Sequence, residues 1–190
     1  MPLPKEESYS YADLLSWGEG TRYELYDGRL TALASPSRLH QEISMELSAQ
    51  LRAYLRGKRC RVYAAPFDVR LFEKEGEGPG SVDTVVQPDL MVVCDPGKLD
   101  QRGVRGAPDL VVEILSDSTR RTDRLTKFNL YQLAGVREYW IVDPAARIVQ
   151  VHTLEDGRYH SPVAYNGTAS VPVGILEDCH IDLTAVFADA

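Results

Sequence analysis

Apolar residues recur every four positions between residues 39 and 55, and this spacing predicts an amphipathic helix. The stripe consists of Leu39, Ile43, Leu47, Leu51 and Leu55. Ser35 and Pro36 have the residue types of an N-cap and a first helical position, and Gly57 that of a C-terminal stop. We therefore expect a helix of about five turns whose apolar face is buried.

Strand-like runs lie on both sides of this helix. Residues 22–33 predict a hairpin, because Asp27 and Gly28 form a two-residue turn signal between strand-like flanks. Residues 85–94 and 109–115 predict two further strands, and the nearly continuous apolar residues of the second are typical of a strand covered on both faces. The remaining strand-like runs are 60–65, 67–72, 138–143, 147–153 and 158–165.

The order of these elements predicts the fold class. Further helices are expected at residues 8–17, at 119–134 before Gly135, and at the C-terminal end, while Pro66 indicates a hairpin or one bent strand. The unit from 109 to 143 should be a right-handed parallel crossover. We therefore predict an α/β fold in which helices flank both faces of a mixed sheet. With neither repeat nor linker, the prediction is one domain over residues 1–190.

Composition indicates an ordinary globular protein. The chain of 190 residues is 44% hydrophobic and 26% charged. No apolar run approaches the roughly 20 residues of a membrane helix, and the first residues lack the pattern of a signal peptide, so we expect a cytoplasmic protein. Cys60, Cys94 and Cys179 form no CxxC pair, which argues against a zinc knuckle or redox motif, and Cys94 is expected to be ordinary core.

The net charge of −7 argues against a passive nucleic-acid coat. It is compatible with a nuclease, because a bound divalent metal supplies local positive charge. Basic residues form two clusters, one of Arg52, Arg56, Lys58, Arg59 and Arg61, the other of Arg120, Arg121, Arg124 and Lys127. The first cluster fits a solvated helix face and a phosphate-binding track equally well.

Two acids interrupt apolar strands, Asp89 in VVQPDLMVV and Glu113 in VVEIL. A carboxylate there is costly to bury unless it is paired or holds a metal. One such acid could lie at a strand end or pair with arginine, but two in neighbouring strands favour a shared site. Asp109 lies about 13 Å from Glu113 along one strand, whereas adjacent strands are about 4.8 Å apart. Asp89 and Glu113 therefore suit Mg²⁺ or Mn²⁺, which prefer oxygen ligands.

Three other polar residues are weaker candidates. Lys127 shares a helix face with Asp123 and Tyr131, and could stabilise charge on a scissile phosphate. Spacing alone favours an exposed Asp–Lys pair worth about 0.3–0.5 kcal/mol. His40 could be a structural histidine, and an alternating strand could simply expose Glu24. The chain has no GxGxxG, P-loop, GxSxG or HExxH motif.

Several segments together resemble the Uma-two family, also called domain of unknown function 820, of the restriction-endonuclease-like PD-(D/E)XK superfamily. They are RYELYDGRL (22–30), His40, QPDLMVV (87–93) and APDLVVEILSDSTRRTDRLTKFNLYQLAGVREYWIVDP (107–144). The resemblance extends from about residue 10 to 185. It implies a restriction-endonuclease-like core, with a central mixed β-sheet flanked by helices on both faces, and a Mg²⁺-dependent phosphodiesterase-type site.

The resemblance also implies roles for individual residues. Asp89 and Glu113 would bind the metal, with the backbone carbonyl of Ile114 as a further ligand. Leu115 stands where the motif has its lysine, and Lys127 on the following helix matches a displaced lysine.

Two further positions complete the implied site. Glu24 and His40 match the polar residues that this family places nearby. His40 could serve as an auxiliary acid, base or ligand.

Three hypotheses follow. The first is a metal-dependent DNA endonuclease, with a homodimer supplying the two sites that cut both strands. The second is a non-catalytic nucleic-acid-binding or protein-interaction module on the same fold, which would bind DNA with a steep salt dependence. The third is a structural or regulatory protein with a large exposed apolar patch. Divalent-ion binding that disappears in Glu113→Ala would distinguish the first.

Overall fold

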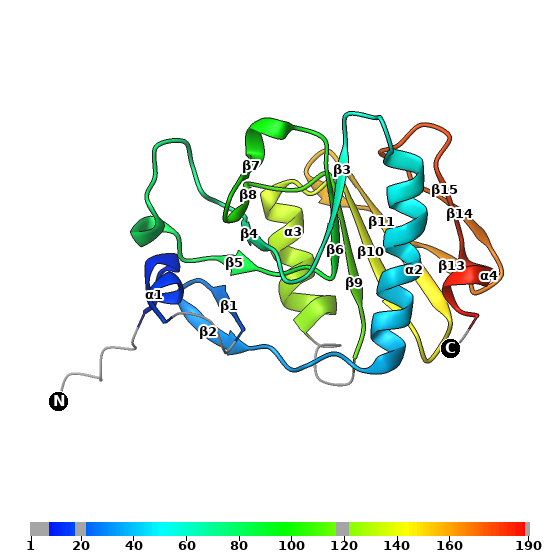
Figure 1. The fold of residues 1–190 in the computed structure, drawn as a ribbon, viewed down its shortest axis with the longest axis horizontal. Helices are drawn as coiled ribbons and strands as arrows, with labels where there is room; N and C mark the ends of the chain where they lie inside the picture. Colours follow the sequence, from blue (N-terminus) through cyan, green and yellow to red (C-terminus); the bar gives the residue numbers. More distant parts are fainter. Residues whose placement is uncertain (1–7, 18–21, 117–121, 189–190) are drawn as a thin grey trace.

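The computed structural model describes residues 8–17, 22–116 and 122–188 (Figure 1). Within these residues, the elements in chain order are α1 (Tyr11–Ser16), β1 (Tyr23–Tyr26), β2 (Arg29–Ala32), α2 (Arg38–Leu55), β3 (Arg61–Ala64), β4 (Asp68–Arg70), η1 (Pro79–Ser81), β5 (Val85–Val86), β6 (Leu90–Val93), η2 (Pro96–Lys98), β7 (Leu99–Asp100), β8 (Gly103–Arg105), β9 (Leu110–Ile114), η3 (Thr122–Lys127), α3 (Phe128–Ala134), β10 (Glu138–Asp143), β11 (Ile148–Glu155), β12 (Arg158–Tyr159), β13 (Val163–Asn166), β14 (Ser170–Pro172), β15 (His180–Asp182) and α4 (Leu183–Val186).

The strands form two large sheets and one small sheet. A seven-stranded sheet has the order β12-β11-β10-β9-β6-β3, with β13 beside β11, and a six-stranded sheet has the order β2-β1-β5-β4-β8-β7. Strands β9 and β10 are parallel, with Val112 opposite Trp140, whereas β6 and β9 are antiparallel. The mixed sheet and the parallel connection between residues 109 and 143 are therefore confirmed.

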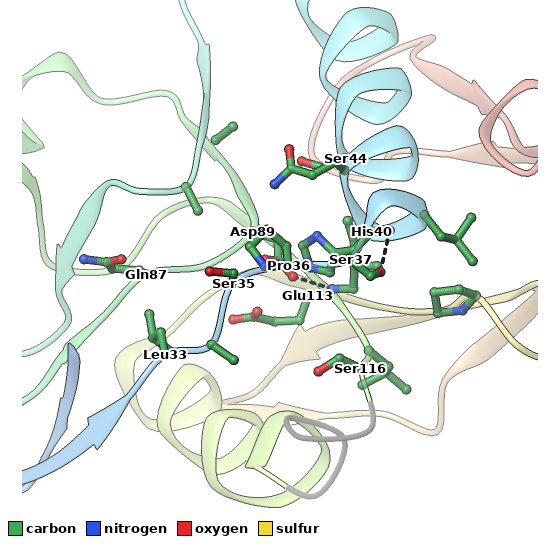
Figure 2. Close-up of a pocket in the computed structure, with 18 of the residues that line it drawn as sticks. Leu33, Ser35, Pro36, Ser37, His40, Ser44, Gln87, Asp89, Glu113 and Ser116 are labelled. Atoms are coloured by element: carbon green, nitrogen blue, oxygen red, sulfur yellow. Dashed lines mark hydrogen bonds and ion pairs between the residues drawn. The ribbon is translucent and has the colours of Figure 1, made fainter. Parts of the chain in front are cut away.

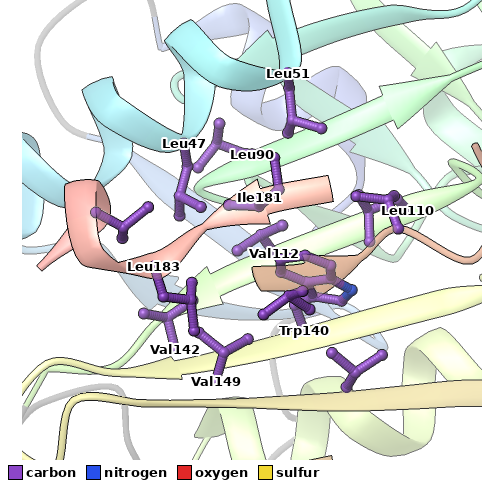
Figure 3. Packing of buried hydrophobic residues seen from close by; sticks show 14 of the residues in the cluster. Leu47, Leu51, Leu90, Leu110, Val112, Trp140, Val142, Val149, Ile181 and Leu183 are labelled. Carbon is purple, nitrogen blue, oxygen red and sulfur yellow. The ribbon is translucent and has the colours of Figure 1, made fainter. Parts of the chain in front are cut away.

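Helices cover both faces of the seven-stranded sheet, as predicted (Figure 1). Neighbouring residues of a strand point to opposite faces. Val112 accordingly packs in the cluster that contains Leu47 and Leu51 of α2, whereas Val111 packs in the cluster that contains Tyr131 of α3. Figure 3 shows the α2 side of this core, where the leucine stripe meets the sheet.

The prediction of one strand over residues 85–94 was wrong. Strand β5 ends at Val86 in the six-stranded sheet, and β6 begins at Leu90 in the seven-stranded sheet. The runs on either side of Pro66, β3 and β4, likewise belong to different sheets and form neither a hairpin nor one bent strand. A proline cannot donate a ladder hydrogen bond, and in both segments the chain changes sheets across one, Pro66 or Pro88.

Local details also differ from the sequence predictions. The N-cap of α2 is Ser37, whose side chain accepts a hydrogen bond from the backbone N of His40, and not Ser35. The polar connection 95–107 contains β7 and β8, which pair through a short hairpin. The run 158–165 divides into β12 and β13, which both pair with β11.

Cys94 is not ordinary core, because it forms a disulfide with Cys60. Arg61 and Val93 are opposite each other in the antiparallel β3–β6 pair. The next residues outward are Cys60 and Cys94, so the strand register brings the two thiols together. Of the helices in the described ranges, none is both long and apolar enough to cross a membrane.

The leucine stripe should carry much of the stability of the fold. Leu47 is fully buried, whereas Met45 on the same helix is 66% exposed. We expect Leu47→Ala to lower the free energy of unfolding by about 2–5 kcal/mol, because it removes buried methyl groups and leaves a cavity. The matched variant Met45→Ala should change it by less than about 0.5 kcal/mol. Urea unfolding followed by circular dichroism measures both, and equal effects would contradict this packing.

His152 should make stability depend on pH. Burial lowers its pKa below the ordinary value of 6.5, and the charge of Arg124 acts in the same direction. The unfolded chain therefore binds more protons, so the free energy of unfolding should fall as the pH drops from about 6.5 through the folded-state pKa. His152→Phe should flatten this part of the pH profile, and replacement of the exposed His180 should not. An unchanged profile in His152→Phe would refute the assignment.

Candidate functional site

A cavity of about 650 Å³ opens where the first turn of α2 lies beside the start of β6 and the end of β9 (Figure 2). Residues 33–37, which lead from β2 into α2, form part of its wall. Its charged and polar lining includes Arg22, Ser37, His40, Ser44, Gln87, Asp89, Glu113, Ser116 and Lys127. The cavity thus contains four of the five candidate catalytic residues.

Strand register brings Asp89 and Glu113 together. Leu90 of β6 is opposite Val112 of β9, so the next residues, Asp89 and Glu113, face each other at the end of this antiparallel pair. The backbone N of Ile114 donates to Oδ2 of Asp89 at 2.7 Å, which holds that carboxylate across the two strands. The predicted proximity of the two acids is therefore found, although Asp89 lies just outside β6 and not within a continuous strand.

Lys127 lies between two buried glutamates. Its Nζ is 3.0 Å from Oε1 of Glu113 and 3.0 Å from Oε1 of Glu24. The three residues are only 1–3% exposed. In such surroundings a charge is stable only when it is paired and hydrogen-bonded. The alternative that Lys127 belongs to an exposed Asp–Lys pair is therefore wrong, because Lys127 is buried. The side chain of Asp123 lies outside what the structure describes.

Two tyrosines also donate hydrogen bonds to these glutamates. The hydroxyl of Tyr131 donates to Oε1 of Glu113 at 2.6 Å, and that of Tyr26 donates to Oε2 of Glu24 at 2.5 Å. Burial raises the pKa of both tyrosines, so their hydroxyls remain protonated donors. The backbone N of Gln87 adds a hydrogen bond of 2.8 Å to Oε1 of Glu24. Glu24 supports Lys127 and does not line the cavity.

His40 binds the outer carboxylate of the site. Its Nε2 is 3.1 Å from Oδ1 of Asp89. If Nε2 carries the proton, Nδ1 is left as an acceptor. Nδ1 is buried and has no hydrogen-bond partner among the residues that the structure places. His40 therefore contacts Asp89 and has one buried, unsatisfied nitrogen at the cavity.

Asp109 is bound by residues outside the cavity. Its carboxylate accepts hydrogen bonds from the backbone N of Cys94 at 2.7 Å and from Arg137 at 3.2 Å. It does not line the cavity, which agrees with its rejection as the partner of Glu113.

The first basic cluster is exposed but lies away from the cavity. Arg52 is twelve residues beyond His40 in α2, or about 18 Å along the helix. Of the second cluster, Arg120 and Arg121 lie outside the described residues, and Arg124 lies near Asp143.

The sequence predictions missed Tyr26, Gln87 and Arg22. Tyr26 could have been found, because it lies two residues after Glu24 and so shares its strand face. Gln87 and Arg22 carry no comparable signal, since both reach the cavity from segments whose contact depends on the tertiary fold.

The donor set at the cavity wall suits a hard cation. No group of three His, Cys, Asp or Glu side chains placed to hold a metal ion occurs in the described part of the chain. Mg²⁺, however, is commonly held by one or two carboxylates, with water and substrate phosphates as its other ligands. Asp89, Glu113 and the carbonyl of Ile114 offer only oxygen atoms, so they fit Mg²⁺ or Mn²⁺ better than a softer metal.

Comparisons with known proteins identify the family of the chain. The Uma2 family, described as "Putative restriction endonuclease", matches residues 9–184. The uncharacterized protein slr1290 of Synechocystis sp. is 32% identical over 160 residues, which cover 82% of this chain and 78% of that protein. A second uncharacterized Synechocystis sp. protein, sll1609, is 25% identical over 123 residues, or 63% of this chain and 65% of that protein.

A solved structure shares the fold. It is the crystal structure of "a putative nuclease belonging to DUF820" from Anabaena variabilis. It superposes with a TM-score of 0.74 over 94% of this chain and 97% of that chain, at 18% sequence identity. The nuclease-like fold is therefore confirmed.

Removal of the buried cation should destabilise the protein strongly. In Lys127→Ala, two buried carboxylates lose their shared partner, and we expect the free energy of unfolding to fall by about 3–5 kcal/mol at neutral pH. The loss should shrink in acid, because protonation of one carboxylate relieves the repulsion. Arg38→Ala removes an exposed partner of Glu42 and should cost less than about 1 kcal/mol. Denaturant unfolding at two pH values tests this, and a small, pH-independent loss would contradict it.

Proposed function

Because this chain belongs to the Uma2 family, we propose that it is a metal-dependent endonuclease that hydrolyses phosphodiester bonds in DNA. One observation carries the proposal: Asp89 and Glu113 face each other at the wall of a cavity, and Lys127 is bound to Glu113. Two carboxylates and a lysine are the groups that such a reaction needs for a metal and for a phosphate that gains charge. The nuclease-like fold supports the same conclusion.

Asp89 and Glu113 would hold Mg²⁺ or Mn²⁺, with the carbonyl of Ile114 as a further ligand. When bound, the ion would polarise the scissile phosphate and lower the pKa of a bound water. The protein keeps the carboxylates in place beforehand, since Asp89 is held by the backbone N of Ile114 and by His40. Ligands fixed in this way bind a metal more tightly than mobile ones.

Lys127 and Glu24 would act on Glu113. Lys127 fixes the Glu113 carboxylate through Oε1, and Glu24 fixes Lys127 in turn. The ammonium group would also stabilise negative charge on the phosphate, and its effect would be large because Lys127 is buried. His40 would orient Asp89 through Nε2, and its Nδ1 would be the acceptor left for a water.

The proposal extends to partners and location. DNA is the expected partner, and a homodimer would supply two sites for two strands. We expect a cytoplasmic location, and the Cys60–Cys94 disulfide is a feature that few proteins of that compartment have.

A cleavage assay tests the proposal. Purified protein is incubated with plasmid and single-stranded DNA in Mg²⁺ or Mn²⁺, beside Asp89→Asn and Glu113→Gln. Each variant should cleave at least about a hundredfold more slowly, because the substitution removes the charge of a metal ligand. The shape of the side chain stays nearly unchanged. Asp109→Asn removes an equivalent charge outside the cavity and should keep the wild-type rate. Circular dichroism verifies that every variant is folded.

Two other outcomes would redirect the assignment. Folded wild-type protein that neither cleaves DNA nor binds a divalent ion would overturn the endonuclease. Binding of DNA with a steep salt dependence but without cleavage would indicate a non-catalytic nucleic-acid-binding module instead.

A further inference from the structure

Arg22 brings to the cavity a positive charge that, among the described residues, forms no ion pair with a carboxylate. It lies immediately before β1 and lines the cavity with Gln87. Its Nε donates to Oε1 of Gln87 at 2.9 Å, and this is the one polar contact of its side chain within the described residues. Lys127 differs, because two carboxylates neutralise it. Arg22 is thus the lining cation whose terminal guanidinium nitrogens are left for an anion.

The direction of Arg22 is fixed by a hydrogen-bonded chain behind it. Nε2 of Gln87 donates to Oδ1 of Asp68 at 2.8 Å, and the hydroxyl of Tyr11 donates to Oδ2 of Asp68 at 2.7 Å. An ionised carboxylate only accepts, so the amide nitrogen of Gln87 must face Asp68 and its oxygen must face Arg22. Tyr11 is 2% exposed, and burial raises its pKa. The row of hydrogen bonds behind Arg22 therefore ends at a buried, protonated hydroxyl.

Gln87 also connects Arg22 to the buried glutamates. Its side chain binds Arg22, while its backbone N binds Oε1 of Glu24, which in turn pairs with Lys127. In Figure 2, Gln87 lies apart from the group of Asp89, His40 and Glu113. Arg22 therefore lines the same cavity as Asp89 and Glu113, and its side chain is held by Gln87.

We propose that Arg22 binds a backbone phosphate of the nucleic-acid strand next to the one at Asp89 and Glu113, with Gln87 as its positioning residue. This inference rests on the proposed function. It names a residue that would bind a phosphate other than the one to be cleaved. Together with Lys127 and a bound divalent ion, such a contact would offset the repulsion between the acidic wall and the substrate. A guanidinium held at Nε can present its remaining nitrogens as a fork, which matches two phosphate oxygens better than an ammonium does.

Binding without cleavage tests the proposal. The probe is a fluorescein-labelled single-stranded oligodeoxyribonucleotide, titrated by fluorescence anisotropy at several salt concentrations in Mg²⁺ buffer. The protein carries Glu113→Gln, so that the probe stays intact. Adding Arg22→Ala should weaken binding roughly tenfold and reduce the salt slope by about 0.7, the value for one phosphate of a single strand. Arg102→Ala, at an exposed turn outside the cavity, should change neither quantity.

Two further variants separate charge from position. Arg22→Lys should keep the salt slope but lose part of the affinity, because an ammonium lacks the fork. Gln87→Ala keeps the charge and releases its anchor, so it should also keep the slope and weaken binding. A folded Gln87→Ala protein with wild-type affinity would remove the positioning role.

The outcomes for Arg22 and for the nuclease are distinguishable. Cleavage by the wild type, with binding and slope unchanged in Arg22→Ala, would overturn the phosphate contact and leave the endonuclease standing. An Arg22-dependent slope in a protein that never cleaves would establish the contact and overturn the enzyme. A folded protein that neither binds the probe nor cleaves DNA would overturn both.

Discussion

The buried ion pairs of Lys127 with Glu24 and Glu113 are the interaction on which the site depends. Glu24 belongs to the six-stranded sheet, Glu113 to the seven-stranded sheet and Lys127 to η3. One ammonium group therefore ties three parts of the chain together. Each glutamate would be costly to bury without it, and the tyrosine hydroxyls satisfy further lone pairs. The site is preorganised, because these ion pairs and hydrogen bonds fix the orientation of the two carboxylates and of the ammonium group.

Two changes of sheet place the remaining components. The chain leaves the six-stranded sheet after Val86 and enters the seven-stranded sheet at Leu90. The three residues between therefore connect the two sheets, and they differ in their contacts. Gln87 contacts Glu24 and Arg22, Pro88 takes no part in a ladder, and Asp89 faces Glu113. The short QPD segment thus links the carboxylates to the arginine at the cavity.

The charge distribution explains how an acidic protein could act on a polyanion. The net charge of −7 would repel nucleic acid at long range. At the cavity, the balance is set locally by Lys127, by Arg22 and by any bound divalent ion. The exposed basic cluster at the end of α2 lies too far along that helix to line the cavity. Recognition of a phosphate at this site would therefore depend on single, well-oriented cations and not on a broad basic surface.

The sequence by itself determined the local elements and the identity of the main chemical groups. The leucine spacing of α2, the Asp27–Gly28 turn and the continuous apolar run of β9 depend on neighbours in the chain, and all three were predicted correctly. The acids at 89 and 113 were recognisable because charge is costly in an apolar strand. Only the tertiary structure decided how the sheets divide at Pro66 and Pro88, that Lys127 is buried, and that Cys60 meets Cys94. It also decided that Gln87 holds Arg22, although 65 positions separate them. These contacts join segments that are distant in sequence, and their energy depends on burial and register, which no local pattern encodes.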